Sequence, residues 1–278
     1  MTNAAEPTAS ESEGSVSVEG RGHLLLIGLN RPAKYNGLTP TMMDELVDAF
    51  TRLDDDPDLW VGVVFGHGDH FTAGLDLPKF TALMEQGTRS VDDVADAPPA
   101  STPRVDPFGL KRWCRKPIVT AVHGITYTAG LELMLAGDIA IAADNCRFSQ
   151  LEPARAIHAT GGATIRFVDR AGWGNAMYHL LTSDEFDSAE ALRCGFVQEV
   201  VPLGRQLDRA IEIAERIAQG APAAVQATKA SSRRFVTEGH QAAIDALAPT
   251  QAELTKTADY AEGIASFVER RTADFTGR

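Results

Sequence analysis

The stretch KPIVTAVHGITYTAGLELMLAGDI, from Lys116 to Ile139, contains the local signals of a strand, a glycine turn and a helix. Pro117 to Val122 is a short apolar run, which is typical of a buried strand, and it leads into a turn at Gly124. Thr128 follows as the candidate N-cap of a short helix, and Ile139 to Ala143 is the next expected strand. This alternation of strands and helices predicts an α/β fold.

The same alternation is found nearer the N-terminus. His23 to Leu29 and Trp60 to Phe65 are apolar runs bounded by Gly, Asn, Asp and Pro, as buried strands are. A helix is expected between them, with Thr39 as its N-cap and Pro40 at its first position. From Leu207 onward only helices are expected, over Leu207 to Gln219, Pro222 to Val236, Ala242 to Thr257 and Ala261 to Arg271.

These patterns divide the chain into three parts. Residues 1–15 are expected to be a disordered polar tail, residues 16–205 an α/β core, and residues 206–278 a C-terminal helical module. Inside the core, Thr81 to Pro107 has scattered Asp and Pro residues and predicts a partly mobile excursion of the kind that often forms a lid.

Composition excludes several classes of function. The chain has 278 residues, 44% of them hydrophobic, and a formal net charge of -12, which argues against nucleic acid or an anionic membrane surface as a partner. Cys114, Cys146 and Cys194 lie far apart without any CxxC spacing, so neither a disulfide framework nor a zinc site is predicted. No secretory signal or membrane-length apolar run is found, and we expect a cytoplasmic protein.

Two acidic residues in a mostly small and apolar run need an explanation. Glu132 and Glu152 are twenty residues apart in LELMLAGDIAIAADNCRFSQLEPA, Leu131 to Ala154. Each could simply point to solvent, because glutamate is almost never buried without a partner. If the two meet at one cavity, they can divide the roles of general acid and general base.

Two glycine turns follow predicted strands. One is HGDHFTAGLDL, His67 to Leu77, and the other begins at His123. Two turns at the ends of neighbouring strands could direct two backbone N–H groups at one oxygen, which would form an oxyanion hole. His67 and His70 lack a third ligand at a zinc spacing, and we interpret them as loop residues.

With these motifs in order, the chain resembles the crotonase or enoyl-CoA hydratase superfamily from about His23 to Phe275. The resemblance rests on five stretches in sequence, namely LNRPAKYNGL, FTAGLDL, KPIVTAVHGITYTAGLELMLAGDI, CRFSQLEPA and FVERRTADF. It implies a spiral of repeated ββα units with a C-terminal helical module that supports homotrimers, which commonly pair into hexamers.

The resemblance also implies site residues and an activity. It places the two backbone amides that polarise a thioester carbonyl at Leu75 and Ala129, and the two hydratase carboxylates at Glu132 and Glu152. Water would then be added to a 2-enoyl-CoA, with Glu132 as the base and Glu152 as the proton donor to C2. The substrate would be an acyl-CoA thioester, and no metal or separate cofactor is implied.

Contacts with coenzyme A are implied at further positions. In the turn around Gly74, the resemblance implies that Ala73, Asp76 and Leu77 contact the nucleotide part of coenzyme A. Lys34 lies one position from the commonest lysine of the family and is a candidate for contact with the phosphates of coenzyme A. An equally good interpretation is a surface side chain that contacts only solvent. The candidates at the C-terminal end are Arg270 and Arg271.

Three alternatives remain open at this point. One glutamate could shuttle a proton between C2 and C4, as in an enoyl-CoA isomerase or another crotonase-type reaction. The scaffold could also bind acyl-CoA without catalysis, although a binder needs neither carboxylate and burying both would cost stability. A serine hydrolase has little support, since no GxSxG motif is present and Ser149 has no assigned base.

Overall fold

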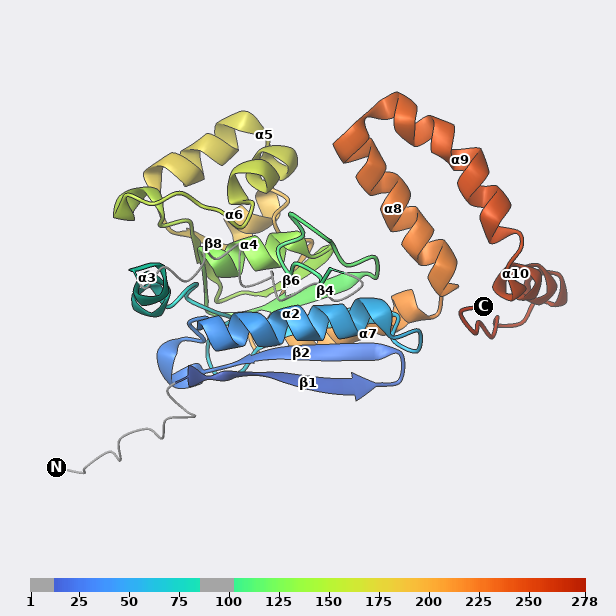
Figure 1. The fold of residues 1–278 in the computed structure, drawn as a ribbon, viewed down its shortest axis with the longest axis horizontal. Coiled ribbons are helices and arrows are strands. Elements are labelled where there is room, and N and C mark those ends of the chain that lie inside the picture. Colours follow the sequence, from blue (N-terminus) through green and yellow to red (C-terminus); the bar gives the residue numbers. More distant parts are fainter. Residues whose placement is uncertain (1–12, 86–102) are drawn as a thin grey trace.

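A computed structural model of the chain describes residues 13–85 and 103–278. Most of the predicted tail and most of the predicted Thr81 to Pro107 excursion therefore lie outside the described residues. The predicted α/β core is present (Figure 1). Its larger sheet has six strands in the order β1-β2-β3-β4-β6-β9. These strands are β1 Ser15–Arg21, β2 Leu24–Asn30, β3 Val61–Gly66, β4 Ile118–Val122, β6 Ile139–Ala143 and β9 Glu199–Val201.

All four strands expected from sequence are found, as β2, β3, β4 and β6. Strand β1 was not predicted, and it begins at Ser15, the last residue assigned to the tail. It pairs antiparallel with β2, whereas the other neighbours in the large sheet are parallel. The polar sequence of β1 explains the omission, because an edge strand with exposed residues lacks a continuous apolar run.

A smaller sheet produces the repeating ββα arrangement. Its strands are β5 Ile125–Tyr127, β7 Arg147–Ser149 and β8 Phe186–Asp187, in the order β5-β7-β8. Strands β4 and β6 lie in the large sheet, and the strands that follow them, β5 and β7, lie in the small one. Helix α4, Ala129–Ala136, comes directly after β5 and completes one such unit.

Helices cover both faces of the large sheet. Helix α2, Pro40–Asp55, begins where predicted, with Thr39 Oγ1 accepting a hydrogen bond from the Met42 N–H at 3.2 Å. Leu25 and Ile27 of β2 pack in the same apolar cluster as α2. Their neighbours Leu24 and Leu26 belong to the cluster on the other face, which includes α7, Gln206–Ala218. Successive strand residues point to opposite faces, and both faces are covered by helices. Strand β2 is therefore apolar at almost every position.

The remaining helices follow the sequence expectation with shifts of a few residues. Helices α8, α9 and α10 span Pro222–Glu238, His240–Leu254 and Ala258–Glu269. Helix α7 packs on the sheet, whereas α8 to α10 extend away from the core as an arm (Figure 1). The other described elements are η1 Pro32–Lys34, α3 Leu77–Glu85, η3 Pro153–Arg155, α5 Ala163–Thr182 and α6 Ser188–Arg193.

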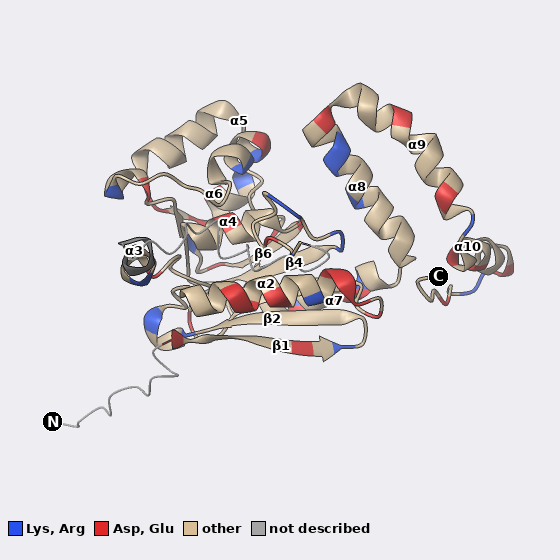
Figure 2. Ribbon diagram, in the orientation of Figure 1, with Lys and Arg blue, Asp and Glu red and all other residues tan. Residues whose placement is uncertain are grey.

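Polar contacts join helix α8 of this arm to the core. Lys229 Nζ lies 2.7 Å from Asp138 Oδ2, and the Arg233 guanidinium lies 4.6 Å from the centre of the Trp113 ring. Basic segments are visible on α8 and acidic ones on α2 and α9 in Figure 2. Among the helices that the structure describes, none has the length and apolar character needed to span a membrane.

Candidate active site

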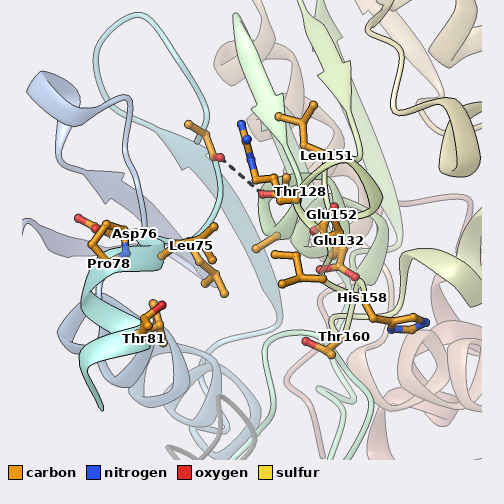
Figure 3. Close-up of a pocket in the computed structure, with 16 residues that line it drawn as sticks. Leu75, Asp76, Pro78, Thr81, Thr128, Glu132, Leu151, Glu152, His158 and Thr160 are labelled. Carbon is orange, nitrogen blue, oxygen red and sulfur yellow. Dashed lines mark hydrogen bonds between the residues drawn. The ribbon is translucent and has the colours of Figure 1, made fainter. Parts of the chain in front are cut away.

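One cavity brings together all four residues predicted to take part in catalysis. It has a volume of about 530 Å³, and its lining includes Leu75, Ala129, Glu132 and Glu152. Figure 3 shows Leu75 on one side of this cavity and both glutamates on the other. Leu75 precedes α3, Ala129 begins α4, Glu132 lies one turn into α4, and Glu152 comes from the loop after β7. The fold therefore assembles the site from segments up to 77 residues apart in the chain.

The Leu75 and Ala129 amides are available for an external acceptor. The flanking N–H groups are occupied, since Gly74 donates to Thr72 Oγ1 at 3.1 Å and Asp76 donates to the Leu38 carbonyl at 2.8 Å. Neither Leu75 nor Ala129 donates its N–H to an acceptor within residues 13–85 and 103–278. Ala129 is the first residue of α4, where backbone N–H groups have no partner inside the helix.

Thr128 occupies the predicted N-cap position but does not cap the helix. Its side chain makes no hydrogen bond to the first turn of α4, so the predicted capping role is wrong. Its backbone has φ 49° and ψ −121°, a conformation that a β-branched residue rarely adopts. Instead of capping, Thr128 Oγ1 faces the Ala73 carbonyl oxygen at 3.5 Å (Figure 3), which links the two turns that carry the free amides.

Glu132 is buried and held by backbone. Its residue exposure is 3%, and its Oε1 accepts a hydrogen bond from the Ala163 N–H at 3.0 Å. Burial raises the pKa of this carboxyl above its ordinary value, while the backbone hydrogen bond and the charges of Arg166 and His158 oppose that rise. The alternative in which this residue points to solvent is therefore excluded.

Glu152 is buried as well, but it has fewer partners. Its Oε1 accepts a hydrogen bond from Gln150 Nε2 at 3.3 Å, and its Oε2 has no partner in the part of the chain that the structure describes. Burial, followed by the negative charge of Glu132, raises the pKa of Glu152 to about 7, and Arg155 opposes the shift. The two carboxyls are thus near enough to influence each other's charge, in environments that differ in hydrogen bonding.

The predicted coenzyme A contacts fall into two groups. Ala73, Asp76 and Leu77 all line the cavity. The Asp76 carboxylate also forms an ion pair with the buried Arg31, whose Nη1 lies 2.8 Å from Asp76 Oδ2. Lys34 is exposed at the end of η1 and does not line the cavity.

The two C-terminal arginines are not brought to the cavity within one chain. Arg270 ends α10, and Arg271 forms ion pairs with Glu262 and Glu269 of the same segment. Neither residue lines the cavity, and α10 lies at the far end of the arm from α3 (Figure 1). Their contact with coenzyme A remains a prediction.

Sequence reasoning missed several groups at the site. Arg155 and His158 are exposed, but both line the cavity. Their position in the loop after Glu152 was the available signal. Arg31 was not singled out, because nothing local indicates that it pairs with a residue 45 positions away.

The other histidines and the serine that were considered have ordinary hydrogen bonds. His67 Nε2 lies 2.7 Å from Ser17 Oγ, and His70 Nδ1 accepts a hydrogen bond from the Ile125 N–H at 3.1 Å. Ser149 Oγ donates to the Ser183 carbonyl at 2.9 Å. These bonds account for the three side chains as structural groups.

Comparison with known proteins identifies the family and the relatives of this chain. Residues 19–278 match the family model described as enoyl-CoA hydratase/isomerase. The chain is 33% identical over 270 residues to enoyl-CoA hydratase EchA19 of Mycobacterium tuberculosis, covering 96% of this chain and 98% of that protein. It is 31% identical over 255 residues to 2,3-dehydroadipyl-CoA hydratase of Escherichia coli, covering 92% and 96%.

Solved structures agree with the sequence relatives. A probable enoyl-CoA hydratase/isomerase from Mycobacterium abscessus superimposes with a TM-score of 0.86 at 44% identity, covering 95% of this chain and 98% of that one. An enoyl-CoA hydratase from Mycobacterium tuberculosis H37Rv gives a TM-score of 0.82 at 31% identity, covering 95% and 99%. The spiral α/β core expected from sequence is therefore the fold of this chain.

Proposed function

Because the chain belongs to the enoyl-CoA hydratase/isomerase family, we propose that it hydrates a 2-enoyl-CoA, adding water across the C2=C3 double bond. The observation that carries this proposal is the cavity in which two buried glutamates, Glu132 and Glu152, face two backbone amides that have no acceptor among the described residues. An isomerase needs only one carboxylate to move a proton, whereas hydration uses two groups that differ in protonation.

The Leu75 and Ala129 amides would bind the thioester carbonyl oxygen. As a hydroxyl adds to C3, negative charge moves onto this oxygen and an enolate-like species develops. Two preoriented N–H groups stabilise that charge without having to reorganise. The loss of one donor in such a hole costs on the order of 3 kcal/mol in the barrier.

The environments of the two carboxyls support the division of roles that we propose. Glu132 is stabilised as an anion by the Ala163 N–H, which suits a base that takes a proton from water. Glu152 Oε2 has no partner within residues 13–85 and 103–278, and the Glu152 pKa is about 7, so a large fraction is protonated at neutral pH. It would donate its proton to C2. The reaction changes no overall oxidation state, and coenzyme A enters only as part of the substrate.

Hydration is tested directly by incubating the purified chain with crotonyl-CoA and following loss of the conjugated-thioester absorbance. We expect the absorbance to fall and a 3-hydroxyacyl-CoA to form. Because the acyl chain is not specified by these residues, 2-enoyl-CoAs of different length and branching belong in the same assay. Conversion of 3-enoyl-CoAs without any hydration at any length would instead support an isomerase.

A non-catalytic acyl-CoA binder is the alternative of a different class. It would bind coenzyme A thioesters with unchanged affinity when both glutamates become glutamine, and it would turn over none of them. The burial of two carboxyls in one cavity argues against it, because a binder gains nothing from the cost of desolvating them.

We also propose that the chain assembles as a homotrimer or homohexamer through its helical arm. Helices α8 to α10 expose large apolar side chains, including Phe235, Leu247, Phe267 and Val268, at 50%, 55%, 82% and 73%. Exposed apolar groups along projecting helices are typical of an interface between subunits, and α5 exposes Trp173 and Leu181 as well. Assembly could also bring Arg270 and Arg271 near the cavity of a neighbouring subunit.

A further inference from the structure

Three side chains that can each ligate a metal ion meet outside the catalytic cavity. His179 lies near the end of α5, Glu190 lies in α6, and Cys194 ends that helix. Their ligand atoms all lie within 4.8 Å of one another. None of the three lines the catalytic cavity, so the cluster is separate from the chemistry proposed there.

The distances between the three ligand atoms fit one tetrahedral ion. His179 Nε2 lies 3.1 Å from Glu190 Oε1, Cys194 Sγ lies 3.5 Å from the same oxygen, and Sγ lies 3.9 Å from Nε2. Zinc bonds to nitrogen, oxygen and sulfur imply separations of about 3.3 Å between N and O and about 3.5 Å between S and either of them. Movements of roughly 0.4 Å or less would therefore complete a three-ligand site.

The donor set also indicates which ion would bind. Glu190 and Cys194 are four residues apart in one helical turn, and His179 approaches from the neighbouring helix. A sulfur ligand excludes the hard ions Mg²⁺ and Ca²⁺, which take oxygen ligands. Nitrogen, sulfur and carboxylate ligands in a tetrahedral arrangement suit Zn²⁺, and its probes Co²⁺ and Cd²⁺.

Arg193 is the competitor for this site. Its guanidinium donates to both oxygens of Glu190 and lies 3.6 Å from Cys194 Sγ. The Arg193 side chain is 56% exposed, so solvent screens its ion pair with Glu190. An exposed arginine can turn into solvent, and a metal ion can then neutralise the carboxylate in its place.

The burial of this cluster fits a bound metal ion better than a thiol that reacts with a substrate. Cys194 and His179 are each 3% exposed, which leaves no room for an acyl substrate at the sulfur. The Glu190 side chain is 28% exposed and gives a small ion a route to the cluster. His179 Nδ1 has no hydrogen-bond partner among the described residues, so one N–H would stay unpaired and the affinity would be moderate.

We propose that His179 Nε2, Glu190 Oε1 and Cys194 Sγ bind one Zn²⁺ ion, with a water molecule as the fourth ligand. Binding forms a Zn–S bond as the Cys194 S–H bond breaks, and the thiol proton passes to solvent. The ion joins the end of α5 to α6 and therefore stabilises the folded chain rather than taking part in hydration. This proposal does not depend on the function proposed for the cavity.

The test is a metal titration of the full chain after treatment with a chelator. Cd²⁺ is added while its charge-transfer absorbance with thiolate is recorded, and Zn²⁺ is then used to displace it. We expect one ion per chain, a Kd in the micromolar range or below, and a higher melting temperature with Zn²⁺. Cys194→Ser should abolish the band and His179→Gln should weaken binding at least about 100-fold, whereas Cys146→Ser should change neither.

Cys194→Ser or His179→Gln could unfold the chain, because both side chains are buried. Arg193→Ala provides a test that does not depend on these two variants. The position is exposed, and removing the competing cation should tighten Cd²⁺ binding by up to about fivefold. Absence of a thiolate band in both the unchanged chain and Arg193→Ala would overturn the proposal. Unchanged binding in folded Cys194→Ser would overturn it as well, because the ion would then lie elsewhere.

Discussion

The side chain of Thr128 fills the space directly beside Gly74, where a β-carbon would lie 1.7 Å from Thr128 Oγ1. This contact joins the turn that carries the Leu75 amide to the turn that carries the Ala129 amide. Only glycine fits at position 74, because the contact leaves no room for a side chain and because its φ is 97°. The spacing of the two amides therefore depends on a residue that has no side chain.

Gly74→Ala should displace one of the two turns. We expect kcat/KM for 2-enoyl-CoA to fall by about 100-fold, similar to the loss of one oxyanion donor. The free energy of unfolding should fall by about 2–4 kcal/mol from strain and overlap together. Gly204→Ala is the matched control, since Gly204 has φ 90° but nothing within 4 Å of its β-carbon position. Equal losses of kcat/KM and of unfolding free energy in both variants would show that backbone strain, and not the contact with Thr128, causes the effect.

Glu132→Gln and Glu152→Gln should each lower kcat by about 100-fold or more, because the amide can neither accept nor donate the proton. Affinity for coenzyme A thioesters should change little, since the amide occupies the same volume. Steady-state kinetics and equilibrium binding separate the two effects. Glu185→Gln, which alters an exposed partner of Arg147, serves as the control. Full activity in both site variants would refute the acid and base assignment.

The pH dependence of kcat/KM should be bell-shaped, with its alkaline limb near pH 7. The proposed mechanism of hydration requires Glu132 ionised and Glu152 protonated, and the proton leaves Glu152 as pH rises through its pKa of about 7. Dehydration of the 3-hydroxyacyl-CoA should have the same profile, because the overall reaction neither takes up nor releases a proton. In Glu132→Gln the limb should move to lower pH, since the charge of Glu132 helps to raise the pKa of Glu152. A flat profile between pH 6 and pH 9 would contradict this account.

Glu152→Gln should make the folded chain more stable at pH 8. The folded-state pKa of about 7 lies above the ordinary value of 4.5, so the native state binds the extra proton between these values and stability falls as pH rises through that window. Removing the ionisable group should stabilise by about 1–3 kcal/mol at pH 8 and by almost nothing near pH 4.5. Denaturant unfolding at both pH values gives the comparison. A variant that is less stable than the unchanged chain at pH 8 would exclude a desolvated carboxylate at this position.

Phe267→Asp should weaken the proposed assembly. Phe267 is 82% exposed on α10, and a charge there would have to be desolvated in a subunit interface. Light scattering should report a trimeric or hexameric mass for the unchanged chain and smaller species for the variant. Leu203→Asp, at an exposed apolar residue outside the arm, should leave the mass unchanged. A monomeric mass for the unchanged chain would remove the basis of the assembly proposal.

The core strands and helices could be predicted from sequence because their signals are local. The apolar runs of β2, β3, β4 and β6 and the Thr39 cap of α2 need only a few neighbouring residues to be recognised. Strand β1 lacks such a run and was missed. The assignment of α7 to the C-terminal module followed from its helical pattern, which cannot reveal that its apolar face covers the large sheet.

The candidate site residues and their order along the chain could be identified before the fold was known. The fold was needed to show that Glu132 and Glu152 share a cavity and that Arg31 forms an ion pair with Asp76. It also showed that Thr128 packs against Gly74 instead of capping α4. It also decided that Cys194, which has no metal spacing along the chain, meets His179 and Glu190. The physical reason is that hydrogen-bond geometry, burial and pKa shifts depend on distances across the fold, which local periodicity and propensity do not encode.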